Sequence, residues 1–133
     1  MLRAEDYNAL GAFRHAMRKF LRFSKEILAE ADLTPEQYEA LLAIKSRSSE
    51  NGLNIRDLSE QLQIRHHSAV NLVNKLAARR MIFRKRAAAD RREVLVKLSS
   101  SGEADLARLV AIHRQEIRRR SAEMIEALQR LQK

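Results

Sequence analysis

The chain has 133 residues, of which 45% are hydrophobic and 5% aromatic, and it contains three glycines, one proline and no cysteine. So few turn-forming residues exclude an all-β fold, and the lack of cysteine excludes a disulfide framework, a thiolate metal site and a thiol redox switch. The net charge of +9 favours a polyanionic partner, with nucleic acid ahead of a membrane surface because the basic residues do not oppose a broad apolar helical face.

Residues 6–30 are predicted to form a long amphipathic helix. Apolar side chains recur there at helical spacing. Together with the apolar residues near the C-terminus, they make more apolar surface than one small lobe can bury, so we expect the chain to self-associate through these two regions. The predicted dimerisation residues are Leu10, Phe13, Met17, Leu109, Ile117, Met124, Ile125 and Leu128.

A second helix is predicted from Thr34 to about Arg47. Thr34 can cap this helix, the proline that follows suits its first turn, and Gln37 can complete a capping box. The polar residues 48–52 indicate a loop. Residues 53–55 indicate a short strand that joins the sheet of the following segment.

Two helices joined by a tight turn are predicted next, a short one over Arg56–Leu62 and a longer one over about Arg65–Arg79. Helical spacing places Asn71 and Asn74 on the side of the longer helix that faces away from its apolar residues. An asparagine amide offers a donor and an acceptor together, which matches adenine in the major groove. The predicted DNA-binding residues of this recognition helix are Arg65, His66, His67, Ser68, Val70, Asn71, Asn74 and Lys75.

A two-stranded wing is predicted to follow, with strands at Met81–Phe83 and Val94–Leu98 and a basic tip over Arg84–Arg92. Residues 54–98 hold eleven lysines and arginines but four acids, which is +7 of the net charge. Arginines at a hairpin tip can enter a narrow minor groove, and Asp90 is placed to orient Arg92. The predicted DNA-binding residues of the wing are Arg84, Lys85, Arg86, Asp90, Arg91 and Arg92.

The C-terminal part is predicted to hold a helix from a cap at Ser101 to about Arg120 and a short last helix that opens at Ser121. The expected fold is mainly α with a small β wing. We expect an N-terminal dimerisation helix at 1–32, a winged helix-turn-helix DNA-binding domain at 33–99 and C-terminal dimerisation helices at 100–133. No apolar run could span a membrane and no apolar signal segment is visible, so a cytoplasmic protein is expected.

Metal and catalytic sites are not predicted, and no cofactor is expected. His66 and His67 are adjacent, and neighbouring helical positions point too far apart to share one tetrahedral ion easily. His15 and His113 are expected to be partly buried between helices. There is no glycine-rich phosphate loop, nucleophile elbow or metalloprotease motif, so an enzyme is not favoured.

Five stretches of the chain follow a recognisable pattern: Leu33-Thr34-Pro35-Glu36-Gln37-Tyr38, Ile55-Arg56-Asp57-Leu58-Ser59-Glu60-Gln61-Leu62, Leu72-Val73-Asn74-Lys75-Leu76, Asp90-Arg91-Arg92 and Leu98-Ser99-Ser100-Ser101-Gly102. Through these stretches, residues 34–120 resemble the multiple-antibiotic-resistance regulator (MarR) family of bacterial transcription factors, and with the flanking helices nearly the whole chain fits. The resemblance implies a homodimer that binds a pseudo-palindrome, often released by a small aromatic or phenolic ligand.

Three positions depart from the pattern of the family. Arg65 stands where a serine or threonine cap is usual, and His67 replaces a frequent proline. Arg80 occupies the place of a helix-ending glycine, where a positive φ would cost about 1 kcal/mol.

The sequence therefore predicts a ligand-responsive repressor that binds double-stranded DNA as a homodimer. One alternative is a DNA-binding protein without an effector, and another is a protein-interaction module that reuses a winged helix. The operator, the regulated genes, the effector and the direction of regulation are left open by the sequence.

Overall fold

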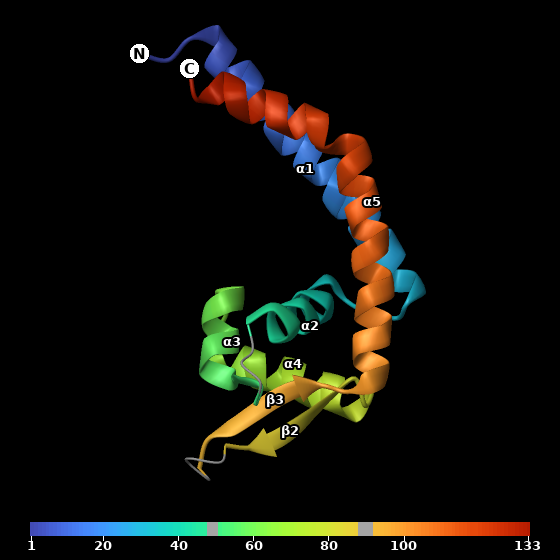
Figure 1. Ribbon diagram of the computed structural model, residues 1–133. Helices are drawn as coiled ribbons and strands as arrows, with labels where there is room; N and C mark the ends of the chain where they lie inside the picture. The colour runs from blue at the N-terminus through green and yellow to red at the C-terminus, as the bar shows by residue number, and fades with distance from the viewer. Residues whose placement is uncertain (48–50, 88–91) are drawn as a thin grey trace. The chain divides into compact units, whose positions relative to one another are not determined.

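The computed structural model describes residues 1–47, 51–87 and 92–133, and these residues form helices with one small sheet (Figure 1). They divide into two compact units, the winged-helix unit (Leu33–Arg108) and the paired-helix unit (Met1–Asp32 with Leu109–Lys133). This is the expected fold class, mainly α with a β wing. The elements are α1 (Ala4–Glu30), α2 (Pro35–Arg47), β1 (Leu53–Asn54), α3 (Ile55–Leu62), α4 (His66–Ala78), β2 (Ile82–Arg86), β3 (Val94–Leu98) and α5 (Ser100–Leu131).

The sheet of the winged-helix unit is antiparallel and has the strand order β1-β3-β2. Figure 1 shows α2, α3 and α4 to one side of β2 and β3. The β-branched and aliphatic residues of β3 suit this central place, because side chains of a central strand must pack on their neighbours. Fully buried side chains from the three helices and from β3 fill the core: Leu41, Ile44, Leu58, Val73, Leu76 and Val96.

Local hydrogen bonds fix the starts of α2 and α3. Thr34 and Gln37 form the predicted capping box, in which each side chain accepts from the backbone N–H of the other at 3.1 Å. Asn54 caps α3, because its Oδ1 accepts from the N–H of Asp57 at 2.7 Å. Both caps satisfy backbone donors that a helix leaves unpaired at its first turn.

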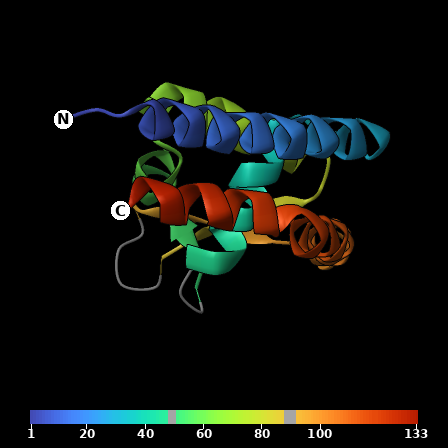
Figure 2. The ribbon, with the colours of Figure 1, turned by 90° about the horizontal axis from the view of Figure 1, so that it is seen from above.

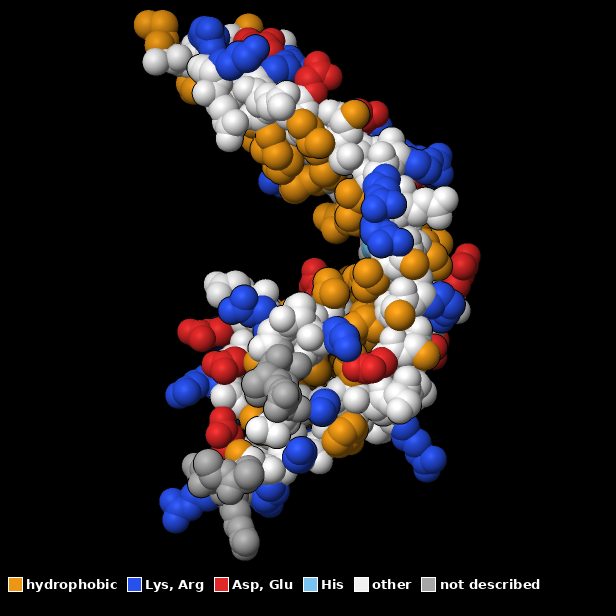
Figure 3. Space-filling view, in the orientation of Figure 1, with side chains coloured by type: hydrophobic (Ala, Val, Ile, Leu, Met, Phe, Trp, Pro, Cys, Tyr) orange, Lys and Arg blue, Asp and Glu red, His pale blue; other side chains and the backbone are white. Residues whose placement is uncertain are grey.

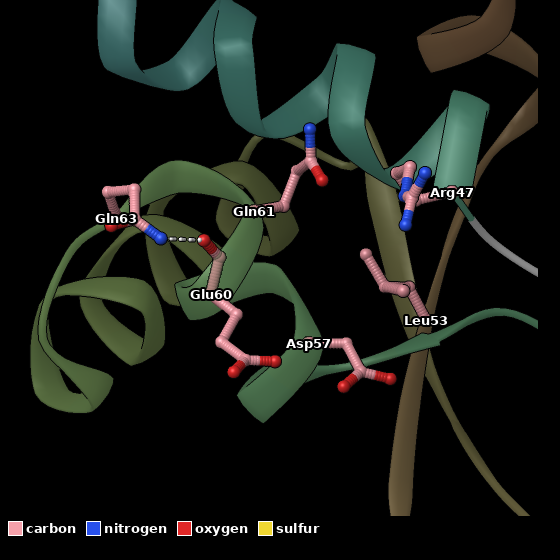
Figure 4. A pocket seen from close by; sticks show the side chains of 6 residues that line it. All are labelled: Arg47, Leu53, Asp57, Glu60, Gln61 and Gln63. Atoms are coloured by element: carbon pink, nitrogen blue, oxygen red, sulfur yellow. Dashed lines mark hydrogen bonds between the residues drawn. The ribbon is translucent and has the colours of Figure 1, made fainter.

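The turn between α3 and α4 depends on Gln63, which adopts the left-handed conformation with φ 56°. Its backbone N–H donates to the carbonyl of Glu60 at 3.2 Å, and its side-chain Nε2 donates to the same oxygen at 2.8 Å. Figure 4 shows this contact beside a hollow of about 280 Å³. The double hydrogen bond ends α3 sharply and so sets the direction in which α4 starts.

The wing differs from the prediction in its first strand. β2 covers Ile82–Arg86, whereas the sequence predicted Met81–Phe83 with a tip that began at Arg84. Arg84, Lys85 and Arg86 are ladder residues because they pair with Val96, Leu95 and Val94 of β3. Cross-strand pairing with an apolar strand outweighs the low strand propensity of a basic run.

The C-terminal part also differs from the prediction. One continuous helix, α5, covers Ser100–Leu131, so the separate last helix predicted to open at Ser121 is wrong. No glycine or proline follows Gly102, and the helix-favouring residues there give no stop signal. The cap is Ser99 rather than Ser101, because the Ser99 Oγ accepts from the N–H of Gly102 at 3.0 Å.

The link from α4 to β2 is held against the first turn of α5. Arg80 lies two residues beyond the end of α4 and has φ 59°, the positive angle that its place in the pattern had suggested. Its carbonyl accepts from the Ser99 hydroxyl at 2.7 Å. The carbonyl of Met81 accepts from the Ser99 N–H at 2.9 Å, and a Cβ added to Gly102 would lie 2.0 Å from the same oxygen. A side chain at position 102 therefore cannot fit without a backbone shift.

In the paired-helix unit, α1 and the second part of α5 run antiparallel side by side (Figures 1 and 2). Glu5 accepts a hydrogen bond from Arg130 near one end of the pair, and Lys19 lies 3.0 Å from Glu123 further along it. These contacts join the beginning of the chain to its end.

Candidate nucleic-acid interface

The recognition helix α4 has one buried side and one exposed side. Ala69, Val73 and Leu76 are completely buried, while Asn71 and Asn74 are exposed on the opposite side. His66, His67 and Lys75 are also exposed, whereas Ser68 and Val70 are half-buried at the flanks. The predicted base-reading side is therefore available, because the apolar stripe anchors the helix by its other side.

The helix α4 begins directly after Arg65, which stands where the family usually has a serine or threonine cap. Arg65 is the N-cap residue, with extended backbone angles and no side-chain hydrogen bond to the first turn. It is exposed. Its guanidinium is a donor, so it cannot satisfy the unpaired N–H groups of that turn.

The pairing register sorts the basic residues of β2 between the two faces of the wing. Arg84 and Arg86 lie on the same face of β2 as the buried Ile82, opposite Val96 and Val94, on the side of the sheet that carries the core. Lys85 points to the other side, because side chains alternate along a strand. Arg84 reaches α4 and donates from its guanidinium to Asn74 Oδ1.

A polar hollow of about 600 Å³ lies where α3, α4 and β3 begin. Arg56, His66 and Arg92 bring basic side chains to it, and Asn54 donates from Nδ2 to Glu93 Oε1 at 2.9 Å. The residues that line the hollow thus come from both the helix-turn-helix and the base of the wing. Sequence reasoning left Arg56 out of the DNA-binding set; its position in the first turn of α3 was the signal that could have included it.

Two of the predicted wing residues, Asp90 and Arg91, lie outside the described residues. Arg92 is exposed. In Figure 3 lysine and arginine side chains are spread over the visible face of the winged-helix unit.

The paired-helix unit leaves much apolar surface exposed, and Figure 3 shows hydrophobic side chains gathered on it. Leu10 and Ile125 are 50% exposed, and Leu128 is 43% exposed. Ile117 is exposed as well, and Phe13, Met17 and Met124 are half-buried. Leu109 differs from the other predicted dimerisation residues, because it is fully buried within the chain itself and so offers no surface to a second copy.

The histidines separate into exposed and buried ones. His15 is exposed, contrary to the expectation of partial burial, while His113 is buried. Among residues 1–47, 51–87 and 92–133, no three His, Cys, Asp or Glu side chains gather as a metal site would require. None of the helices in these ranges is both long and apolar enough to cross a membrane.

A short helix, a tight turn, an exposed polar helix and a basic two-stranded wing define a winged helix-turn-helix, a class of DNA-binding protein. The model of the MarR family matches residues 31–93, which include these elements. These residues therefore match the MarR family of transcription regulators, which the sequence resembles.

Solved structures share this fold. MepR, a transcription regulator of the Staphylococcus aureus multidrug efflux pump MepA, has 21% identity and a TM-score of 0.73, with 84% of this chain and 80% of that one covered. A MepR variant bound to an oligodeoxyribonucleotide has 23% identity, a TM-score of 0.71, and coverage of 84% and 79%. CouR from Rhodococcus jostii, bound to p-coumaroyl-CoA, has 20% identity, a TM-score of 0.71, and coverage of 80% and 73%. No curated relative matches the sequence.

Proposed function

We propose that this DNA-binding regulator is a cytoplasmic repressor that binds a pseudo-palindromic operator as a homodimer. The observation that carries the proposal is the side-by-side placement of two donor-rich elements, the exposed side of α4 and the inner face of β2, joined by the contact between Asn74 and Arg84. One docking pose would present the helix to base edges and the wing to the backbone. The MepR variant that shares the fold is bound to an oligodeoxyribonucleotide, which supports DNA as the partner.

The proposed readout uses the middle of α4. Asn71 lies at the centre of the exposed side and would contact base edges, with Val70 against a thymine methyl group. His66, His67 and Ser68 lie in the first turn, where such helices enter the groove, with Arg65 and Lys75 at the flanks.

Phosphates are the proposed partners of the basic groups around the polar hollow. Arg56 and Arg92 enter the hollow from α3 and from the base of the wing, and their positive charge suits a DNA backbone. Glu93 is held by Asn54. The proposed role of Glu93 is therefore to fix the base of the wing rather than to touch DNA. Arg91 is proposed to contact DNA at the tip of the wing, and Asp90 is proposed to orient Arg92.

Two copies are proposed to join through the exposed apolar residues of the paired-helix unit. Covering this surface would remove it from water, and a dimer sets the spacing of two half-sites. A small aromatic or phenolic ligand that favours one spacing would change the affinity for DNA. CouR, which shares the fold, is bound to p-coumaroyl-CoA, whose acyl group carries a phenol ring.

The test compares one base-reading variant with one phosphate-contacting variant. Asn71→Ala should lose about 1–3 kcal/mol on the preferred duplex, with little change on a scrambled one. Arg92→Ala should weaken binding to both duplexes and reduce the salt slope by about one unit. Lys25→Ala, which removes the same charge from an exposed position of α1, is the control and should leave the salt slope nearly unchanged.

Titrations at several salt concentrations decide the outcome. If the ratio of the two affinities is the same in Asn71→Ala as in the unchanged protein, α4 does not read bases there. Binding that barely weakens with salt would instead indicate a protein-interaction module.

A further inference from the structure

The contact between Asn74 and Arg84 bears on which base the recognition helix selects. Arg84 projects from the inner face of β2, and its guanidinium donates to Asn74 Oδ1 on the exposed side of α4. A guanidinium has N–H donors and no acceptor, so the amide atom that faces it must be the oxygen. The orientation of the Asn74 amide is therefore fixed by its neighbour.

This orientation changes what Asn74 can offer to DNA. A free asparagine amide matches adenine, because its oxygen accepts from the N6 amino group while its nitrogen donates to N7. In this chain the oxygen faces a positively charged donor, which leaves the two N–H groups of Nδ2 as the free polar atoms. Asn74 and Arg84 together present donors.

We infer that the Asn74–Arg84 pair selects guanine, in place of the adenine that Asn74 alone would favour. Guanine shows two acceptors in the major groove, N7 and O6, whereas adenine shows one acceptor and one donor. The N6 amino group of adenine would face the N–H groups of Asn74 Nδ2, donor against donor, whereas guanine presents two acceptors to them. The inference rests on the proposed function, since it assumes that the exposed side of α4 faces base edges.

The neighbouring basic residue of the same strand supplies a matched control. Lys85 also carries one positive charge and is also exposed, but the register places it on the opposite side of the wing from Arg84. Removing Lys85 therefore changes the charge of the wing by the same amount without touching Asn74. Lys85 belongs to the predicted DNA-binding residues of the wing, so Lys85→Ala is expected to weaken binding to all duplexes while leaving the base preference unchanged. A difference in base preference between Arg84→Ala and Lys85→Ala therefore reports the contact with Asn74 and not the charge.

The experiment selects bound duplexes from a library with randomised base pairs and sequences them. The base pair contacted by residue 74 is the one whose preference disappears in Asn74→Ala. The unchanged protein and Lys85→Ala should both prefer guanine there, by about tenfold over adenine. Arg84→Ala frees the amide oxygen and should shift the preference to adenine by a similar factor. Thermal unfolding of each variant confirms that it is folded.

A double variant separates the pair from a direct contact of Arg84 with the base. In the Asn74→Ala background, Arg84→Ala should no longer alter the preference at this base pair, because the effects of two coupled residues are not additive. An equal effect in both backgrounds overturns the inference, as does selection of adenine by the unchanged protein. If no duplex is preferred at any position, the proposed function itself fails, and this inference with it.

Discussion

Ser24 on α1 and His113 on α5 form a buried hydrogen bond, with 2.8 Å between Ser24 Oγ and His113 Nε2. The Nδ1 atom of His113 lies 2.7 Å from the carbonyl of Leu109, which can accept but not donate. Nδ1 therefore donates to that carbonyl, and in a neutral imidazole Nε2 accepts from the serine hydroxyl. The rings of Phe20 and Phe23 pack edge-on against the imidazole, with 6.1 Å between ring centroids in each case. This polar contact therefore lies among aromatic side chains.

We predict that Ser24→Ala lowers the free energy of unfolding by about 1–3 kcal/mol, because a buried nitrogen loses a hydrogen-bond partner. The double variant Ser24→Ala, His113→Phe should recover part of the loss, since both polar partners are then removed. Urea denaturation measures both effects. His15→Ala, at an exposed position of α1, should change stability by less than about 0.5 kcal/mol. A Ser24→Ala variant as stable as this control would contradict the prediction.

Two substitutions at the junction of α4, β2 and α5 are predicted to change the free energy of unfolding in opposite directions. Arg80→Gly should stabilise the protein by about 1 kcal/mol, because glycine adopts the φ of 59° without steric cost. Gly102→Ala should destabilise it by about 3 kcal/mol or more, because the new Cβ would lie 2.0 Å from the Met81 carbonyl oxygen. Thermal unfolding measures both.

Gly11 is the matched control for the substitution at Gly102. It lies within α1, and a Cβ added there would meet nothing within 4 Å. Gly11→Ala should therefore stabilise the protein, by roughly 0.5–1 kcal/mol, through its better helix propensity. If alanine changed the free energy of unfolding equally at the two glycines, the predicted steric clash at Gly102 would be contradicted.

Self-association is predicted to depend on the exposed apolar residues of the paired-helix unit. Ile125→Glu should shift the protein from dimer to monomer, and should weaken operator binding with it, because a charge would have to be buried at the interface. Sedimentation at micromolar concentration measures the mass. Leu42→Glu, at an exposed apolar position of α2, is the control and should leave the dimer intact. A monomeric unchanged protein would contradict the proposed assembly.

Acid is predicted to weaken the pairing of α1 with α5. The hydrogen bond from Arg130 lowers the pKa of Glu5, and the hydrogen bond from Lys19 lowers the pKa of Glu123. Both pKa values are lower in the folded protein than in the unfolded chain. The two ion pairs therefore stabilise the fold fully at pH values above the ordinary glutamate pKa of 4.5. This stabilisation is lost as the pH falls through the folded-state values. The melting temperature should therefore fall on acidification by more in the unchanged protein than in Glu5→Gln, Glu123→Gln.

Salt offers a check on the same prediction. Both carboxyl groups are exposed to solvent, so their ion pairs are screened and each contributes little. Raising the salt concentration should reduce the difference between the unchanged protein and the double variant at neutral pH. A difference that is independent of salt would mean that the effect of acid arises elsewhere.

The helix-turn-helix was predictable because its signals are local. The apolar spacing of residues 69–76 fixes the buried side of α4, and Thr34 with Gln37 marks the start of α2 by hydrogen bonds within a few residues. Such contacts do not depend on the rest of the fold, so the sequence by itself determined the order of elements and the exposed side of the recognition helix.

The tertiary structure alone decided what depends on contacts between distant residues. β2 extends to Arg86 because β3 pairs with it, and the same register turns Arg84 towards Asn74 and Lys85 away. Leu109 and Ile117 look alike as apolar helix positions, yet one is fully buried and the other 47% exposed. Strand pairing and core packing are set by the whole unit, and they override the preferences that a short stretch of sequence expresses.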